Sequence, residues 1–417
     1  MSSRIRAKTK TAAAAIRGFS FFCIVHISIT ACSETSDSSA GGELAEAISY
    51  ERGNALVLDA FFNVDESPRQ FGELIRSSLA EGYDIPAGIE ATRILYRSRD
   101  HAGKPTTASA VVLVPEGAAP EGGWPLVVWA HGTTGVARQC GPSATKSLGY
   151  YSIELINELM QRDIALLVVD YAGLSTAGAP HQYMAKTTNA LDIESAVPAA
   201  QAAVNSLSSQ WLAIGHSQGG AAVWGLAEQK ALRPDPGYLG SIALAPAVGG
   251  ADLINNNANL ERETFYPVYW AHAVKAQSPE FAIETMLTEE AVSLYEDLTL
   301  NGCWDYGFAL SASLAPGTVL RAGWEGIPTV EQFLASIRSG EQPISGPLFV
   351  AAGREDIGVR EEFIENAVQA QCETGADVLY RVYPGSHDGM METSFDDQMK
   401  WIEARFAGVA TENGNCG

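Results

Sequence analysis

The chain segment best suited to a chemical role is residues 215–219, with the sequence GHSQG. It follows the apolar run 211–214 and precedes a stretch of small and apolar residues that reads as the start of a helix. A G-x-S-x-G sequence between a strand and a helix is typical of a nucleophile elbow. We therefore predict Ser217 as a nucleophile, with Gly215 and Gly219 required because larger side chains would clash in so sharp a turn. The alternative is an ordinary turn in which the serine caps a helix.

A serine hydroxyl is a weak nucleophile until a base accepts its proton and an acid orients that base. On an elbow scaffold the acid and then the histidine follow the serine along the chain. Only His272 and His387 lie after Ser217. His387 follows the last expected strand, 377–382, in a loop that can reach the edge of the sheet. We therefore predict His387 as the base, because no such strand precedes His272.

The acid should follow the end of the preceding strand, which we place at residues 347–352. Asp356 lies in the loop directly after this strand and is the predicted acid. Glu355 is the competing residue. Asp388 is adjacent to the histidine, and neighbouring side chains in a loop rarely align as a relay. The alternative role for Asp356 is a helix cap.

A tetrahedral intermediate needs hydrogen-bond donors for its negatively charged oxygen. One is expected from the backbone N–H of Gln218, which follows the nucleophile, and the other from a loop after an early strand. Residues 131–135, HGTTG, follow an apolar strand and fit this role. We predict the Thr133 N–H as the second donor. His131 is expected to order the loop and His216 to pack under the elbow.

The elements that must position these groups alternate between buried-strand and helix patterns. Such alternation predicts an α/β fold with a mostly parallel, doubly wound sheet covered on both faces. The pattern breaks over residues 250–345, which we expect to form a helical cap over the sheet edge, with the core formed by 49–249 and 346–417. The expected strands are 94–98, 108–115, 125–130, 164–170, 211–214, 241–245, 347–352 and 377–382, and the expected helices are 151–162, 187–207, 359–371 and 394–406.

Motifs spread over most of the chain form a recognisable set. They are YRS at 96–98 with GKP at 103–105 and VVLVPEG at 111–117, WAHGTTG at 129–135 with Cys140 behind it, VDYAGL at 169–174, and GHSQGG at 215–220. Together they resemble the secretory lipase family of α/β-hydrolases, which includes the yeast lipase A type and bacterial relatives. The resemblance implies the α/β-hydrolase fold, a triad of Ser217, Asp356 and His387, a helical cap, and hydrolysis of carboxylic esters.

The expected activity is therefore that of a serine hydrolase, a lipase or carboxylesterase, which needs no cofactor and no metal. The substrate would be a small-molecule or lipid ester. Acyl transfer, hydrolysis of a polyester or peptide on the same triad, and a non-catalytic binding lipoprotein are the alternatives. Aromatic residues between 265 and 324 could line a lipid tunnel or form the core of the cap.

The N-terminus has the features of an export signal. A basic region precedes a short apolar stretch, and no acidic residue occurs before Glu34. The sequence ITAC ends at Cys32 and resembles a bacterial lipoprotein signal, so we predict cleavage of residues 1–31, acylation of Cys32 and a flexible tether over 32–48. A standard signal peptide is the alternative. The chain is thus expected to be exported, and its only expected membrane contact is this lipid anchor.

Apart from Cys23 and Cys32 the chain has four cysteines, and in an exported protein these suggest two disulfides. Three pairings are possible, of which we favour Cys140–Cys303 and Cys372–Cys416. No cysteine or histidine cluster has zinc spacing. The formal net charge of −22 predicts that the surface repels nucleic acid, so no nucleic-acid partner is expected.

Overall fold

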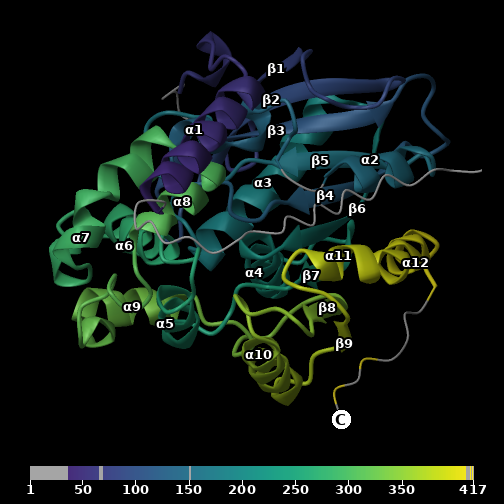
Figure 1. Ribbon diagram of the computed structural model, residues 1–417. Coiled ribbons are helices and arrows are strands. Elements are labelled where there is room, and N and C mark those ends of the chain that lie inside the picture. The colour runs from purple at the N-terminus through teal and green to yellow at the C-terminus, as the bar shows by residue number, and fades with distance from the viewer. Residues whose placement is uncertain (1–35, 65–68, 150–151, 410–413, 415, 417) are drawn as a thin grey trace, which may run out of the picture.

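A single nine-stranded sheet runs through the computed structural model, which describes residues 36–64, 69–149, 152–409, 414 and 416. The strand order is β1-β2-β3-β5-β4-β6-β7-β8-β9 (Figure 1). The strands are β1 Leu74–Leu79, β2 Ile89–Arg99, β3 Pro105–Pro115, β4 Trp124–Ala130, β5 Ala165–Val169, β6 Leu207–His216, β7 Tyr238–Leu244, β8 Leu348–Gly353 and β9 Val378–Tyr383.

The sheet changes from antiparallel to parallel along its width. Strands β1, β2, β3 and β5 pair antiparallel, whereas every pair from β5 through β4 to β9 is parallel. All residues of β5 and β8 are buried, as continuous apolar runs in a covered parallel sheet should be. The predicted mostly parallel α/β fold is confirmed.

Helices cover both faces of the sheet. Helices α3, α4 and α10 contribute buried residues to the core on one face, and α2, α11 and α12 contribute to the core on the other. The helices are α1 Ser36–Asn54, α2 Ser152–Met160, α3 Lys186–Ala203, α4 Gln218–Leu232, α5 Ala251–Ala258, α6 Tyr266–Gln277, α7 Glu289–Ser293, α8 Trp304–Leu310, α9 Pro328–Ser336, α10 Glu361–Glu373, α11 Gly389–Thr393 and α12 Phe395–Phe406. The segment 250–345, here called the inserted segment, is described throughout and contains α5 to α9 but no strand of the sheet.

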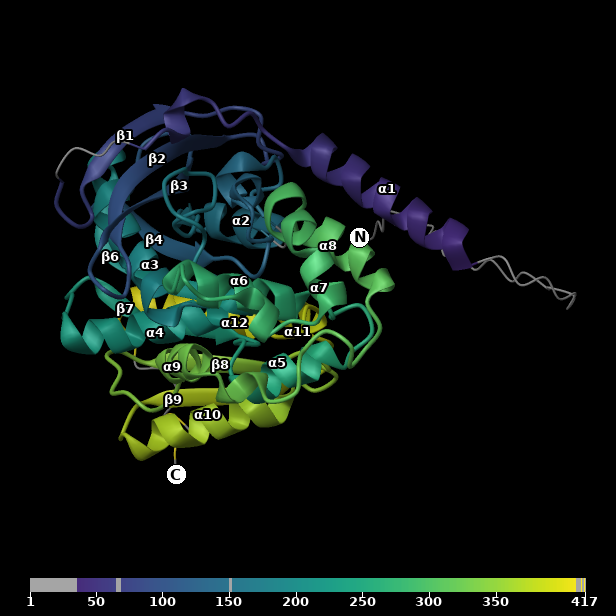
Figure 2. The ribbon, with the colours of Figure 1, turned by 90° about the vertical axis from the view of Figure 1, so that its left-hand side faces the viewer.

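The expected flexible tether over residues 32–48 is wrong from Ser36 onward, because α1 begins there. The good helix formers Ala and Glu each occur three times in this helix. Helix α1 is also held by the inserted segment, beside α8 (Figure 2). The Glu51 carboxylate accepts hydrogen bonds from the backbone N–H groups of Cys303, at 3.0 Å, and Tyr306, at 2.8 Å. Glu43 forms an ion pair with Arg262.

The expected signal segment and Cys32 lie outside the described residues. Among the helices of the described part of the chain, none has the length and apolar character needed to cross a bilayer.

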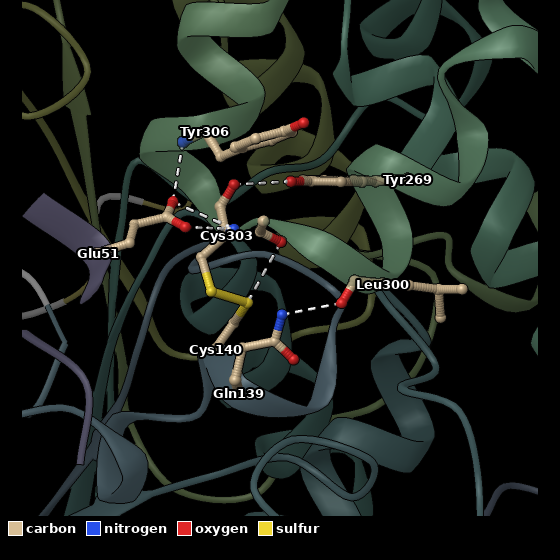
Figure 3. The surroundings of a disulfide bond; sticks show 8 residues. Glu51, Gln139, Cys140, Tyr269, Leu300, Cys303 and Tyr306 are labelled. Carbon is tan, nitrogen blue, oxygen red and sulfur yellow. Dashed lines mark hydrogen bonds between the residues drawn. A yellow bond between two sulfur atoms is a disulfide. The ribbon is translucent and has the colours of Figure 1, made fainter. Parts of the chain in front are cut away.

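Two disulfides, Cys140–Cys303 and Cys372–Cys416, connect the chain in the pairing favoured from the sequence. The first joins the core to the inserted segment, next to the Glu51 hydrogen bonds (Figure 3). Gly135 packs directly against it, since a Cβ added there would lie 2.8 Å from the Cys140 sulfur. The Thr134 carbonyl also accepts a hydrogen bond from the Trp304 N–H at 3.0 Å. The loop 131–135 is therefore fixed from the side of the inserted segment.

Removing this link should destabilise the protein. The double variant Cys140→Ser/Cys303→Ser opens a loop with a sequence separation of 163, and we expect it to lower the free energy of unfolding by about 2–5 kcal/mol. Denaturant unfolding under non-reducing conditions measures this change. The variant Cys372→Ser/Cys416→Ser is the matched control, because it removes a disulfide remote from loop 131–135. Equal stability of the first variant and the unmodified chain would contradict the structural role.

Candidate active site

Ser217 lies at the sharp turn between β6 and α4, as predicted. Its φ of 55° and ψ of −114° place a non-glycine residue in a strained region of backbone conformation. A Cβ on Gly219 would lie 1.8 Å from the carbonyl oxygen of Ala130, and a Cβ on Gly215 would lie 2.3 Å from the carbonyl oxygen of Gly219. Only glycine fits at these two positions, so the turn that presents Ser217 depends on both.

The loops after β8 and β9 bring Asp356 and His387 together. One carboxylate oxygen of Asp356 lies 2.6 Å from Nδ1 of His387. The other oxygen accepts hydrogen bonds from the N–H groups of Gly358 and Val359, at 3.0 and 2.8 Å. The carboxylate is buried, with 5% of the residue exposed. Asp356 is thus held in the orientation that an acid needs to fix the tautomer of the histidine ring.

The competing residues occupy other positions. Glu355 accepts a hydrogen bond from the Gly385 N–H. Its carboxylate therefore holds the backbone of the loop that carries His387 and does not pair with the imidazole ring. His272 lies on α6, where its Nδ1 is 3.0 Å from the hydroxyl of Tyr295, and it lines a cavity that Ser217 does not reach. The structure therefore pairs His387 with Asp356 and leaves these alternatives apart.

His216 packs beside the histidine loop. Its ring centroid is 4.6 Å from that of His387, and its Nε2 donates to the His387 carbonyl at 3.1 Å. Burial, aided by the neighbouring His387, lowers the pKa of His216 to about 4. The ring is consequently neutral at pH 7 and supports the backbone of residue 387.

Ser217, Asp356, His387 and Thr133 line one cavity of about 390 Å³. Aromatic side chains of the inserted segment also line it: Phe265, Tyr266, Trp304 and Phe308. Its size is within the range of small-molecule sites. Residues from four separate strand ends and from the inserted segment thus face the same space.

The loop after β4 is ordered by its own histidine. The Tyr171 hydroxyl donates to the His131 carbonyl at 2.9 Å, and His131 Nδ1 lies 2.6 Å from the Gly132 carbonyl. Burial lowers the pKa of His131 to about 4, so it is neutral at pH 7. The Thr133 hydroxyl lies 3.0 Å from the Tyr183 hydroxyl, and this hydrogen bond fixes the orientation of the Thr133 side chain.

Gln218 begins α4, and its backbone N–H lies at the first helical position, where no intrahelical acceptor exists. Its buried side-chain amide donates to Asn189 at 3.3 Å and lies 3.0 Å from Nε2 of His181. The side chain is thus directed into the core, while the N–H remains a donor at the N-terminus of a helix, which favours negative charge.

Carboxylates dominate the electrostatics of His387. Burial is the largest single influence and would lower its pKa, but the charge and hydrogen bond of Asp356, together with the charges of Asp388 and Glu263, outweigh it, so the pKa is raised above its ordinary value. Burial also raises the pKa of Glu263. Sequence reasoning missed Glu263 because it lies in the inserted segment, outside every motif.

A second set of groups near the base has ligand types suited to a metal. Within the described residues, potential ligand atoms of His216, His387 and Asp388 lie within 4.8 Å of one another. The histidines are already engaged, since Nε2 of His216 contacts a carbonyl and Nδ1 of His387 contacts Asp356. We therefore assign no metal to this set.

Comparisons with solved structures identify the fold as that of the α/β-hydrolases. Lipase A from Candida antarctica in its closed state superimposes with a TM-score of 0.76 at 16% identity, covering 86% of this chain and 88% of that one. The rice cell wall degrading esterase LipA from Xanthomonas oryzae gives 0.65 at 15%, covering 81% and 97%. A putative hydrolase from Legionella pneumophila gives 0.67 at 16%, covering 82% and 100%. No family model and no curated sequence matches the chain.

The electrostatic account of His387 can be tested by titration. Replacing Asp388 by Asn removes a negative charge that favours the imidazolium, so the pKa of His387 should fall relative to the unmodified chain. Two-dimensional NMR of imidazole resonances measures this directly. Glu373→Gln, at the exposed end of α10, is the control and should leave the pKa of His387 unchanged. A rise in the Asp388→Asn variant would refute the account.

Proposed function

We propose that this protein is a serine hydrolase that cleaves carboxylic esters through Ser217, His387 and Asp356. The observation that carries the proposal is the 2.6 Å contact between Asp356 and His387, together with the presence of His387 and the strained Ser217 on the walls of one cavity. The resemblance to secretory lipases and the lipase and esterase folds found among the structural neighbours support the same activity.

In the proposed reaction, the Ser217 hydroxyl attacks the ester carbonyl while the free ring nitrogen of His387 accepts its proton. Asp356 holds the ring and stabilises its charged form. The N–H groups of Gln218 and Thr133 are the proposed donors to the oxygen of the tetrahedral intermediate. His387 then protonates the leaving alcohol, and water, activated by the same ring, hydrolyses the acyl-enzyme.

The raised pKa of His387 has a direct consequence for this reaction. The ring must be neutral to accept the serine proton, so activity should be lost as the pH falls through the pKa of His387. His131 and His216 are also neutral at pH 7, but their pKa values lie near 4. They are therefore weaker bases than His387 and do not compete for the serine proton.

The inserted segment is the proposed cap, because its aromatic side chains line the cavity that contains Ser217. Export and acylation of Cys32 are also proposals. The two disulfides support an oxidising compartment, in which such bonds persist. The proposed chemistry uses side chains and backbone groups of the chain itself together with water.

Substitution of the nucleophile and of the base tests the proposal. Ser217→Ala and His387→Ala should each lower kcat/KM for 4-nitrophenyl acetate by about 10⁴-fold or more, since the groups of a triad act as a unit. Ser217→Ala should also lose labelling by a fluorophosphonate. Ser209→Ala, at the opposite end of β6, is the matched control and should behave as the unmodified chain. Full turnover by either active-site variant would reject the assignment.

A further inference from the structure

Two cavities are lined by both Ser217 and His387, and they differ in size and in the exposure of the residues that line them. The larger, of about 390 Å³, reaches the surface at Ile357, which is 65% exposed, and at Asp388. The smaller has a volume of only about 40 Å³. It extends from Ser217 into the interior beneath the inserted segment, between the end of β7 and helices α5 and α6.

The walls of the small cavity are packed as tightly as a protein core. Tyr183, Leu253 and Trp270 are each 2–3% exposed. The ring of Tyr183 meets that of Trp270 edge to face at 5.6 Å, and Trp270 in turn meets Phe333 at 6.1 Å. Because close-packed interiors resist insertion of additional methylene groups, these walls set a firm limit on what the cavity can hold.

Polar groups occupy another wall of the small cavity. The Asn257 amide donates to the Glu263 carboxyl at 2.6 Å and to the Gly358 carbonyl at 3.3 Å. Both Asn257 and Glu263 line the cavity. An extended alkyl chain directed at this wall would desolvate these groups without offering them a hydrogen bond, which is unfavourable.

From these observations we infer that the small cavity is the acyl pocket, that it accepts acetyl and propionyl groups, and that the larger cavity holds the alcohol. This inference rests on the proposed ester hydrolysis. After the first step the alcohol must leave and water must enter, while the acyl group stays bonded to the Ser217 oxygen. The exposed residues Ile357 and Ser386 line the larger cavity, which permits this exchange. None of the residues that line the smaller cavity is exposed, so the acyl group is assigned to it.

The volume sets the chain length. A cavity needs about 10–15 Å³ of such space to hold one water molecule, so about 40 Å³ corresponds to roughly three. A methyl or ethyl group fits such a space, whereas a hexanoyl or longer chain does not. The aromatic wall formed by Tyr266, Trp304 and Phe308 favours an alcohol with a flat apolar face. The substrate class is therefore an acetate or propionate ester of a larger, partly apolar alcohol.

A series of 4-nitrophenyl esters from acetate to octanoate tests the inference with the full chain. We expect kcat/KM to be highest for acetate or propionate and to be lower by at least about tenfold for hexanoate. A value that rises from acetate to octanoate would overturn the inference.

Variants of the pocket wall provide a second test. Leu253→Ala enlarges the pocket and should shift the preferred acyl group to butyrate or hexanoate. Ile254→Ala is the matched control, because it removes comparable volume from the same helix without lining the pocket and should leave the preference unchanged. An unchanged preference in folded Leu253→Ala would count against the pocket assignment.

A narrowing variant keeps the test independent of the stability of Leu253→Ala. Ala247→Val places two extra methyl groups in the pocket and should lower the ratio of propionate to acetate turnover. An unchanged ratio would contradict the assignment.

Labelling of Ser217 by a fluorophosphonate separates a failure of this inference from a failure of the proposed function. Labelled protein that prefers long acyl chains would overturn only this inference, whereas protein that is neither labelled nor active on any ester would overturn the proposed function as well.

Discussion

The close approach of β4 to the start of α4 is the constraint on which the candidate site depends. Gly219 lies so near the Ala130 carbonyl that no side chain fits between them. Ala130 also pairs with Gly215 in the parallel ladder, so β4 and β6 end at the same level of the sheet. Ser217 and the loop that begins at His131 are therefore placed side by side by one packing contact.

Asp356 and His387 are positioned by an extension of the same sheet. Strands β8 and β9 are parallel neighbours, and their pairing runs to Gly353 opposite Tyr383. Beyond the strands, the Arg354 N–H donates to the Tyr383 carbonyl at 2.9 Å and the Glu355 N–H to the Gly385 carbonyl at 3.0 Å. These bonds hold the two loops together before the side chains meet, so the contact between Asp356 and His387 requires little further ordering.

The sequence was most informative where local pattern and burial coincide. The apolar runs of β4, β5 and β8 were predicted because these strands are buried on both faces, and the elbow was predicted because its glycines are a local requirement. Strand β1 was missed because Leu74–Leu79 contains polar, partly exposed residues at the edge of the sheet. The composition of residues 32–48 predicts a tether, and the order of α1 is not visible in the sequence, because the contacts of Glu51 with Cys303 and Tyr306 join positions more than 250 residues apart. Glu263 and the small cavity could not be predicted, since they arise from packing of segments that carry no motif.

The inserted segment is attached to the rest of the molecule at the places that matter for the site. Its middle part, at Cys303 and Trp304, is fixed to residues 134 and 140, and Glu51 of α1 holds Cys303 from the other side. Its other helices provide the walls around Leu253 and Trp270, whose side chains are part of the main hydrophobic core. A wall that belongs to the core cannot open without loss of core packing. The size limit on the inner cavity is therefore a property of the folded state itself, and selection by chain length would need no movement of a lid.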